Sequence, residues 1–159
     1  MRKRSGTNTR VEDIHWLPAS VRILVVDDFE PWRRCLGSFL RRRPAWQIIC
    51  EASDGLEAVE KSRELQPDIV LLDVGLPTLN GIEAAKQIRE VSPRSRVVFL
   101  SENTCPDVVR EALRVGGCGY VVKSDAGGDL VAALDAAIAN KQFVGRRFLA
   151  CGILDEAAT

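Results

Sequence analysis

The stretch Ile69-Val-Leu-Leu-Asp-Val-Gly-Leu-Pro77 sets four consecutive apolar residues before a single carboxylate, that of Asp73. A short apolar run rich in branched side chains is typical of a strand that is buried on both faces, and such strands belong to parallel sheets. Four more runs of this kind occur along the chain: Ile23-Leu-Val-Val26, Ile48-Ile-Cys50, Val97-Val-Phe-Leu100 and Tyr120-Val-Val122. The sequence therefore predicts five short, buried strands.

Each interval between these runs, and the stretch after the last one, carries apolar residues at helical spacing. Pro31 and Pro106 each open such a segment, and Asp54 and Asn80 each precede a glutamate at the spacing of a capping box. A fifth segment carries apolar residues through positions 130–138. Strands that alternate with helices predict an α/β fold, here a flavodoxin-like doubly wound sheet of five parallel strands, (βα)5, in the order 2-1-3-4-5.

The length of 159 residues leaves room for one domain with short additions. We predict an N-terminal extension over residues 1–20, one domain over residues 21–141, and a C-terminal tail or linker stub over residues 142–159. No stretch reaches the run of about 20 apolar residues that a membrane-spanning helix needs.

Composition excludes several classes of protein. With 46% hydrophobic and 28% charged residues, the chain is typical of globular proteins rather than of disordered ones. Its 22 acidic and 22 basic residues balance, so the broad positive footprint of a nucleic-acid-binding protein is absent. Five cysteines without C-x-x-C spacing and a single histidine disfavour a zinc site and indicate reduced thiols in a cytoplasmic protein.

Charged and hydroxyl side chains follow four of the predicted strands directly. Asp27 and Asp28 follow the first strand, Asp73 the third, Ser101 the fourth and Lys123 the fifth. Because ligands bind beyond the carboxyl ends of parallel strands, we expect these side chains to converge at one edge of the sheet. Three converging carboxylates repel one another unless a cation compensates, and Mg²⁺ prefers such oxygen ligands. An ionised aspartate beside Mg²⁺ and a lysine can act as a nucleophile toward phosphorus.

Four motifs together resemble the receiver domain of two-component response regulators. They are Ile23-Leu-Val-Val-Asp-Asp28, Leu71-Leu-Asp-Val-Gly-Leu-Pro77, Phe99-Leu-Ser101 and Gly119-Tyr-Val-Val-Lys-Ser124, in that order and each at a predicted strand end. The resemblance runs from about Val21 to Lys141. The pair Lys123-Ser124 and the stretch Gln142-Phe143-Val144 are similar to receivers that are joined to LuxR-type, helix-turn-helix DNA-binding domains.

The resemblance assigns expected roles to the acidic residues. It implies that Asp73 is the phosphoacceptor and that the bound metal is Mg²⁺. Asp28 is then a direct metal ligand, Asp27 acts mainly through water, and the backbone carbonyl of Gly75 is a further ligand. Gly75 brings no side chain to a position that influences the phosphoryl lifetime in this family, so we expect easier access of water there.

The same resemblance implies a switch and a phosphate-binding group. Ser101 is expected to be the hydroxyl that moves toward the phosphoryl group, Tyr120 the aromatic side chain that follows it inward, and Lys123 the ammonium that binds the phosphate. The implied protein is a regulatory phosphoacceptor rather than an enzyme. It receives its phosphoryl group from a histidine kinase or phosphotransfer protein and switches a surface that binds a partner or a second copy.

The sequence is compatible with several alternatives. A pseudo-receiver would keep the fold as a binding module without phosphorylation. The chain is either a stand-alone receiver or the receiver of a DNA-binding regulator, and direct nucleic-acid binding by this chain is not expected. A phosphatase of the haloacid-dehalogenase type is a remote alternative, because Asp27 and Asp28 are adjacent rather than in a D-x-D arrangement.

Two local expectations concern the surroundings of the acidic residues. Ser124 is expected to cap the last helix, since serine is a favoured N-cap residue. Phe29 and Trp32 lie beside the acidic residues in sequence and are either an exposed docking patch for a kinase or core contacts of the first helix.

Overall fold

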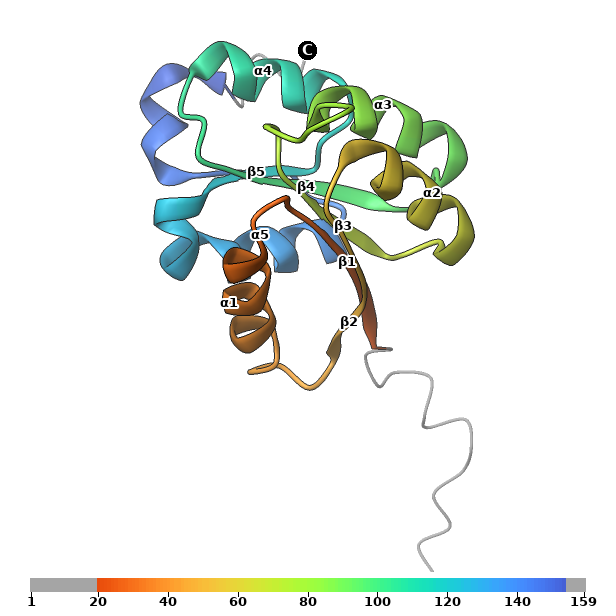
Figure 1. The fold of residues 1–159 in the computed structure, drawn as a ribbon. Helices are drawn as coiled ribbons and strands as arrows, with labels where there is room; N and C mark the ends of the chain where they lie inside the picture. Colours follow the sequence, from red (N-terminus) through yellow and green to blue (C-terminus); the bar gives the residue numbers. More distant parts are fainter. Residues whose placement is uncertain (1–19, 154–159) are drawn as a thin grey trace, which may run out of the picture.

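The computed structural model describes residues 20–153 (Figure 1). The predicted extension over residues 1–20 therefore lies, apart from Ser20, outside the described residues, as do residues 154–159. The strands are β1 (Val21–Val26), β2 (Trp46–Ala52), β3 (Ile69–Leu72), β4 (Arg96–Ser101), β5 (Gly119–Val122) and β6 (Phe143–Val144). The α-helices are α1 (Glu30–Leu40), α2 (Gly55–Leu65), α3 (Gly81–Val91), α4 (Pro106–Arg114) and α5 (Ala126–Ile138), and two 3-10 helices are η2 (Lys123–Asp125) and η3 (Arg146–Cys151).

The strands form one parallel sheet in the order β2-β1-β3-β4-β5-β6. The predicted flavodoxin-like order 2-1-3-4-5 is confirmed, and a sixth strand is added at the β5 edge. In that addition Phe143 pairs with Gly119, and Val144 with Tyr120. The predicted sheet lacked this strand because two residues are too few to give a strand pattern in sequence.

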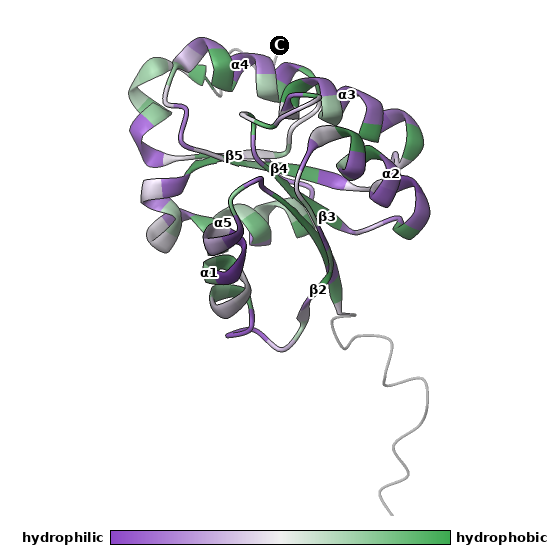
Figure 2. Ribbon diagram, viewed as in Figure 1, coloured by the Kyte–Doolittle hydropathy of each residue, from purple (hydrophilic) through white to green (hydrophobic). Residues whose placement is uncertain are grey.

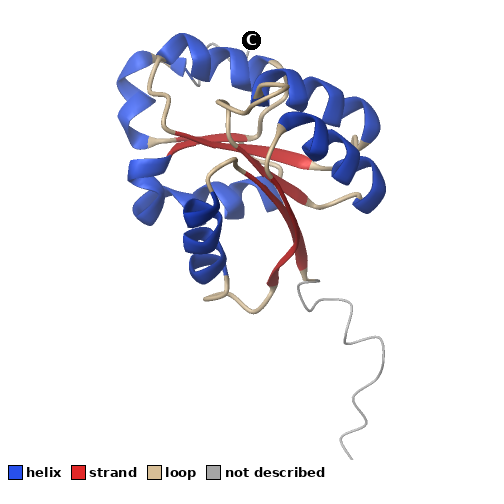
Figure 3. Ribbon diagram, in the orientation of Figure 1, coloured by secondary structure: helices blue, strands red, loops and turns tan. Residues whose placement is uncertain are grey.

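Helices cover both faces of the sheet. In Figures 1 and 3, α1 and α5 lie on one face, and α2, α3 and α4 lie on the other. Figure 2 shows hydrophobic residues along the strands and alternating hydrophilic and hydrophobic residues along the helices. No helix among residues 20–153 is both long enough and apolar enough to cross a bilayer.

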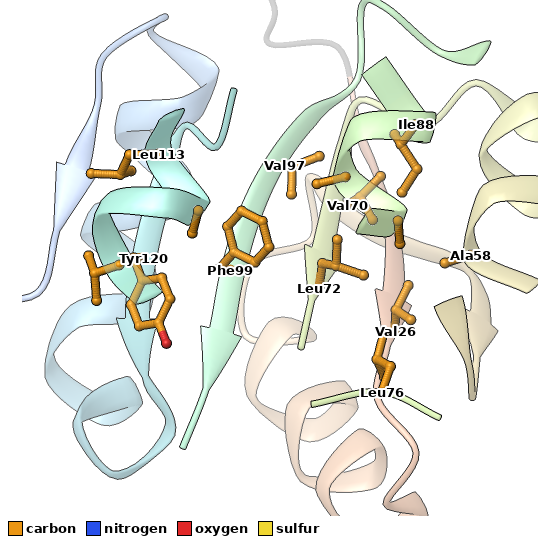
Figure 4. Close-up of a cluster of buried hydrophobic side chains, with 14 of the residues drawn as sticks. Val26, Ala58, Val70, Leu72, Leu76, Ile88, Val97, Phe99, Leu113 and Tyr120 are labelled. Atoms are coloured by element: carbon orange, nitrogen blue, oxygen red, sulfur yellow. The ribbon is translucent and has the colours of Figure 1, made fainter. Parts of the chain in front are cut away.

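The alternation of side chains along each strand divides the core into two clusters. Ile23 and Val25 of β1 pack with α1 and α5, whereas Leu24 and Val26 pack with the helices of the opposite face. Figure 4 shows the second cluster, in which Tyr120 belongs to β5. Because both faces are covered, the inner strands β1, β3, β4 and β5 are apolar along nearly their whole length, which is the pattern that predicts the sheet. The edge strand β2 differs from the predicted buried strand, because only Trp46 and Ala52 at its two ends are buried.

Two of the predicted helix starts are confirmed by their hydrogen bonds. The Asp54 side chain accepts from the backbone N–H of Glu57 at 2.8 Å, and the Asn80 side chain accepts from that of Glu83 at 3.0 Å. The prediction that Ser124 caps the last helix is wrong. Strand β5 continues through η2 directly into α5, whose N-cap is Asp125 without a side-chain bond.

Gly81 allows α3 to begin directly against the carboxyl end of β3. A Cβ atom at this position would overlap the carbonyl oxygen of Asp73. The backbone N–H of Gly81 also donates to the carbonyl of Val74 at 2.8 Å. The close approach of helix and loop therefore fixes the backbone that carries Asp73.

We expect Gly81→Ala to lower the free energy of unfolding by about 1–3 kcal/mol, the usual cost of overpacking. Gly127→Ala in α5 is the matched control, because a Cβ atom there meets nothing within 4 Å. Removing a helical glycine there should raise the free energy of unfolding by about 0.5–1 kcal/mol. Urea denaturation of both variants measures the two effects, and equal effects would contradict the close approach at Gly81.

Candidate functional site

Three carboxylates converge at the carboxyl edge of the sheet. Asp27 follows β1 and Asp73 follows β3, and both are buried, at 2% and 7% exposure, while Asp28 is exposed at the rim. One oxygen atom from each of the three lies within 4.8 Å of the others. The structure thus brings together the three acidic residues that the strand ends indicated, because β1 and β3 are neighbours in the sheet.

The ammonium group of Lys123 bridges the two buried carboxylates. Its Nζ atom lies 2.6 Å from Oδ2 of Asp27 and 3.0 Å from Oδ2 of Asp73. Lys123 begins η2 directly after β5, and its side chain is 11% exposed. Three strands that are far apart in sequence therefore supply one compact cluster of charges.

Burial sets the protonation behaviour of this cluster. Desolvation raises the pKa of Asp27 above its usual value, although the hydrogen bonds from Lys123 and from the backbone N–H of Phe29 oppose the rise. For Lys123, desolvation acts to lower the pKa, but the hydrogen bonds to Asp27 and Asp73 outweigh it and raise the pKa. The ammonium therefore stays protonated at neutral pH.

The donor set fits a hard divalent cation. Three carboxylates face one ammonium, so the cluster holds more negative than positive charge when all of its members are ionised. Carboxylate oxygens at this spacing are the ligands that Mg²⁺ and Ca²⁺ prefer. Gly75 leaves open space beside them, because a Cβ atom built there meets nothing within 4 Å. The acidic pocket can therefore bind a metal ion.

The loop between β1 and α1 is held by contacts with Asp27. The backbone N–H of Phe29 donates to Oδ1 of Asp27 at 2.9 Å, and Nη1 of Arg33 donates to its carbonyl at 2.6 Å. Arg33 is partly buried and was not among the predicted site residues. A basic residue on a helix gives no sequence signal for a contact with a carbonyl in the preceding loop.

A chain of hydrogen bonds links Ser101 to Tyr120. Oγ of Ser101 accepts from the backbone N–H of Asn103 at 3.2 Å, and the carbonyl of Asn103 accepts from the Tyr120 hydroxyl at 2.7 Å. Ser101 is 3% exposed and Tyr120 is fully buried, so the aromatic ring points inward. Burial raises the pKa of the Tyr120 hydroxyl. The two predicted switch residues are thus connected through the backbone of Asn103.

Trp32 lies against the ammonium group rather than in an exposed patch. The centre of its ring is 5.5 Å from Nζ of Lys123, and its side chain packs on the cluster beneath α1 and α5. The sequence allows Phe29 and Trp32 to be either an exposed docking patch or core contacts of the first helix. The core contact is confirmed for Trp32, whereas the side chain of Phe29 is 61% exposed. A cation over a tryptophan ring is held by the ring quadrupole, so Trp32 adds a third contact to Lys123.

Comparison with known proteins points to one family. A family model described as the response regulator receiver domain matches residues 23–135. The chain is 36% identical over 114 residues to the transcriptional regulatory protein LnrK of Bacillus subtilis, covering 72% of this chain and 52% of LnrK. It is 35% identical over 114 residues to the chemotaxis protein CheY of Thermotoga maritima, covering 72% of this chain and 94% of CheY.

A solved structure matches more of the chain. The crystal structure of a two-component response regulator of the LuxR family from Aurantimonas superposes with a TM-score of 0.80 at 32% identity, covering 89% of this chain and all of that one. In contrast, the chain spans about half the length of curated relatives such as LnrK, of which it covers 52%, and LiaR, of which it covers 56%.

We expect Trp32→Leu and Lys123→Met to be coupled in a double-mutant cycle on the free energy of unfolding. The coupling should be about 0.5–2 kcal/mol, the range for a cation over an aromatic ring. Trp46→Leu combined with Lys123→Met is the matched control, because Trp46 begins β2 at the amino end of the strands, where it lies against Arg43. The changes in the free energy of unfolding caused by Trp46→Leu and Lys123→Met should be additive within about 0.5 kcal/mol. If the effects of Trp32→Leu and Lys123→Met were also additive, the Trp32 ring would not stabilise the Lys123 ammonium.

Proposed function

This chain belongs to the receiver domain family of response regulators, and on that premise we propose that it accepts a phosphoryl group on Asp73 and changes a binding surface in response. The observation that carries the proposal is the bridge from Lys123 to the buried carboxylates of Asp27 and Asp73, with open space at Gly75. The phosphoryl donor is a histidine kinase or a phosphotransfer protein.

The chemistry of the transfer follows from an ionised Asp73. One of its carboxylate oxygens attacks phosphorus, an O–P bond forms, and the P–N bond of the donor phosphohistidine breaks, with its electron pair returning to the imidazole. No general base is required, since the attacking carboxylate carries no proton. Lys123 is already within hydrogen-bond distance of Asp73 and neutralises charge on the transferred group, which is the main requirement of phosphoryl transfer.

We propose Mg²⁺ as the metal of the acidic pocket. When bound, it would neutralise charge on the carboxylates and on the phosphoryl oxygens. Asp28 is exposed at the rim and is a direct ligand, whereas Asp27 is engaged by Lys123 at 2.6 Å and acts mainly through water. The Gly75 carbonyl is a further ligand in this proposal, and the bare Gly75 position gives water access to the phosphoryl group.

The output of the domain is a change in protein binding. We propose that Ser101 turns to the phosphoryl group and that Tyr120 is held inward with it, so that the surface around β4, α4 and β5 binds a downstream protein or a second copy. The balanced charge speaks against direct DNA binding by these residues. Relatives such as LnrK are named transcriptional regulatory proteins. We propose that the domain acts either alone or as part of a longer DNA-binding regulator, and that it does so in the cytoplasm.

We expect the intact mass to rise by one phosphoryl group when the chain is incubated with Mg²⁺ and acetyl phosphate or with a phosphorylated histidine kinase. Asp73→Ala should show no such adduct, because the attacking oxygen is missing. Asp107→Asn, at an exposed position of α4, is the matched control and should be phosphorylated like the wild type. An unmodified wild-type chain with both donors would favour a pseudo-receiver, a binding module that is not phosphorylated.

We expect Mg²⁺ to stabilise the folded chain. At free Mg²⁺ tenfold above its Kd, binding adds about 1.4 kcal/mol to the free energy of unfolding. For a chain of this size the melting temperature then rises by about 3–6 °C. Asp28→Asn should lose most of this shift and Asp107→Asn should keep it, as measured by differential scanning calorimetry. An unchanged shift in Asp28→Asn would contradict its role as a ligand.

A further inference from the structure

The segment after α5 packs against the switch residues. Residues 143–153, here called the C-terminal segment, comprise β6 and η3. Val144, Phe148 and Ile153 are 4%, 3% and 2% exposed and belong to the same core cluster as Tyr120. The sequence predicts a tail or linker stub over residues 142–159, yet residues 143–153 fill part of the domain core. In Figure 1 its turns lie beside α4, at the β5 edge of the sheet.

Tyr120 is the centre of this contact. Its ring lies between Phe99, at 6.2 Å, and Phe148, at 5.9 Å in an edge-to-face arrangement. The backbone N–H of Gly145 donates to the Tyr120 carbonyl at 3.0 Å. Both the ring and the backbone of the switch tyrosine therefore hold the C-terminal segment. An outward turn of the Tyr120 ring would remove its edge-to-face contact with Phe148.

A second contact anchors the segment beside Lys123. The guanidinium of Arg147 donates to both oxygens of Asp125, at 2.7 and 3.0 Å, and lies 3.4 Å from Oγ of Ser124. Ser124 and Asp125 follow Lys123 in the same turn of η2. The C-terminal segment thus touches the residues that follow the phosphate-binding ammonium as well as the switch tyrosine.

We propose that the β5 edge of the sheet is an interaction surface whose partner is the C-terminal segment of this same chain, and that phosphorylation of Asp73 tightens its docking. This inference rests on the proposed function. The contacts give a continuous route, from the Ser101 hydroxyl through the backbone of Asn103 to the Tyr120 hydroxyl, and from the Tyr120 ring to Phe148.

The direction of the effect follows from the chemistry of a hydroxyl. The Ser101 hydroxyl can donate to a phosphoryl oxygen while it still accepts from the N–H of Asn103. A phosphoryl group therefore fixes Ser101, which fixes the Asn103 carbonyl that holds the Tyr120 hydroxyl. An inward Tyr120 is the state that packs against Phe148. Phosphorylation favours the inward Tyr120 because the phosphoryl group interacts better with the conformation that holds Tyr120 inward than with conformations that release it.

Hydrogen exchange of the full chain tests the docking. Beryllofluoride with Mg²⁺ serves as a stable phosphoryl analogue, and mass spectrometry follows the backbone amides of residues 143–153. We expect about fivefold slower exchange in this segment with the analogue bound, the lower end of typical coupling between sites. Unchanged or faster exchange, with the analogue bound at saturation, would overturn the inference.

Variants of the segment make the test specific. Phe148→Ala should abolish the slowing and, by reciprocity, weaken beryllofluoride binding about fivefold in a titration. Leu149→Ala is the matched control, because Leu149 is the next residue of η3 and is 60% exposed, and it should behave like the wild type. Arg147→Gln removes the half-exposed pair with Asp125 and should reduce the slowing of exchange even if Phe148→Ala does not fold.

Failure of the inference is distinguishable from failure of the proposed function. If acetyl phosphate adds a phosphoryl group to the wild type but the exchange of residues 143–153 does not change, the proposed function stands and the inference falls. If neither a phosphoryl group nor beryllofluoride binds, both fall. Equal beryllofluoride affinities of Phe148→Ala and Leu149→Ala would also contradict the coupling.

Discussion

A single buried ammonium group, that of Lys123, organises the site. It offsets the repulsion between Asp27 and Asp73, two carboxylates that burial alone would make costly to ionise. Without this bridge the two strands β1 and β3 would end in like charges that face each other away from water. The arrangement leaves Asp28 at the rim, where a cation can add further compensation.

The fold serves to hold these charges in place. Because all strands run parallel, the residues that follow them lie at one edge, and both faces of the sheet are sealed by helices. Local contacts refine the positions: Gly81 lets α3 press against the Asp73 backbone, and Arg33 binds the Asp27 carbonyl. Stability and function therefore depend on the same loops. A substitution that increases the mobility of one of these loops should also change the positions of the Asp27 and Asp73 carboxylates.

The sheet and the position of its acidic edge were predictable from the sequence, because both follow from short-range patterns. Buried strands give apolar runs, and the neighbouring positions of Asp27 and Asp73 then follow from the strand order, in which β1 and β3 are adjacent. Contacts between segments far apart in sequence were not predictable. The pair formed by Phe148 and Tyr120 depends on how a two-residue strand docks after α5, and no local pattern encodes such docking. The expected cap at Ser124 failed for a related reason, since η2 continues from β5 without a break.

In the proposed reaction Asp73, rather than a carboxylate after β1, forms the bond to phosphorus. Borohydride reduces an aspartyl phosphate to homoserine, so reduction of the phosphorylated chain followed by peptide sequencing in a mass spectrometer identifies the acceptor directly. We expect homoserine at position 73 and aspartate at positions 27 and 28. Homoserine at either position after β1, as in a phosphatase whose nucleophile follows the first strand, would contradict it.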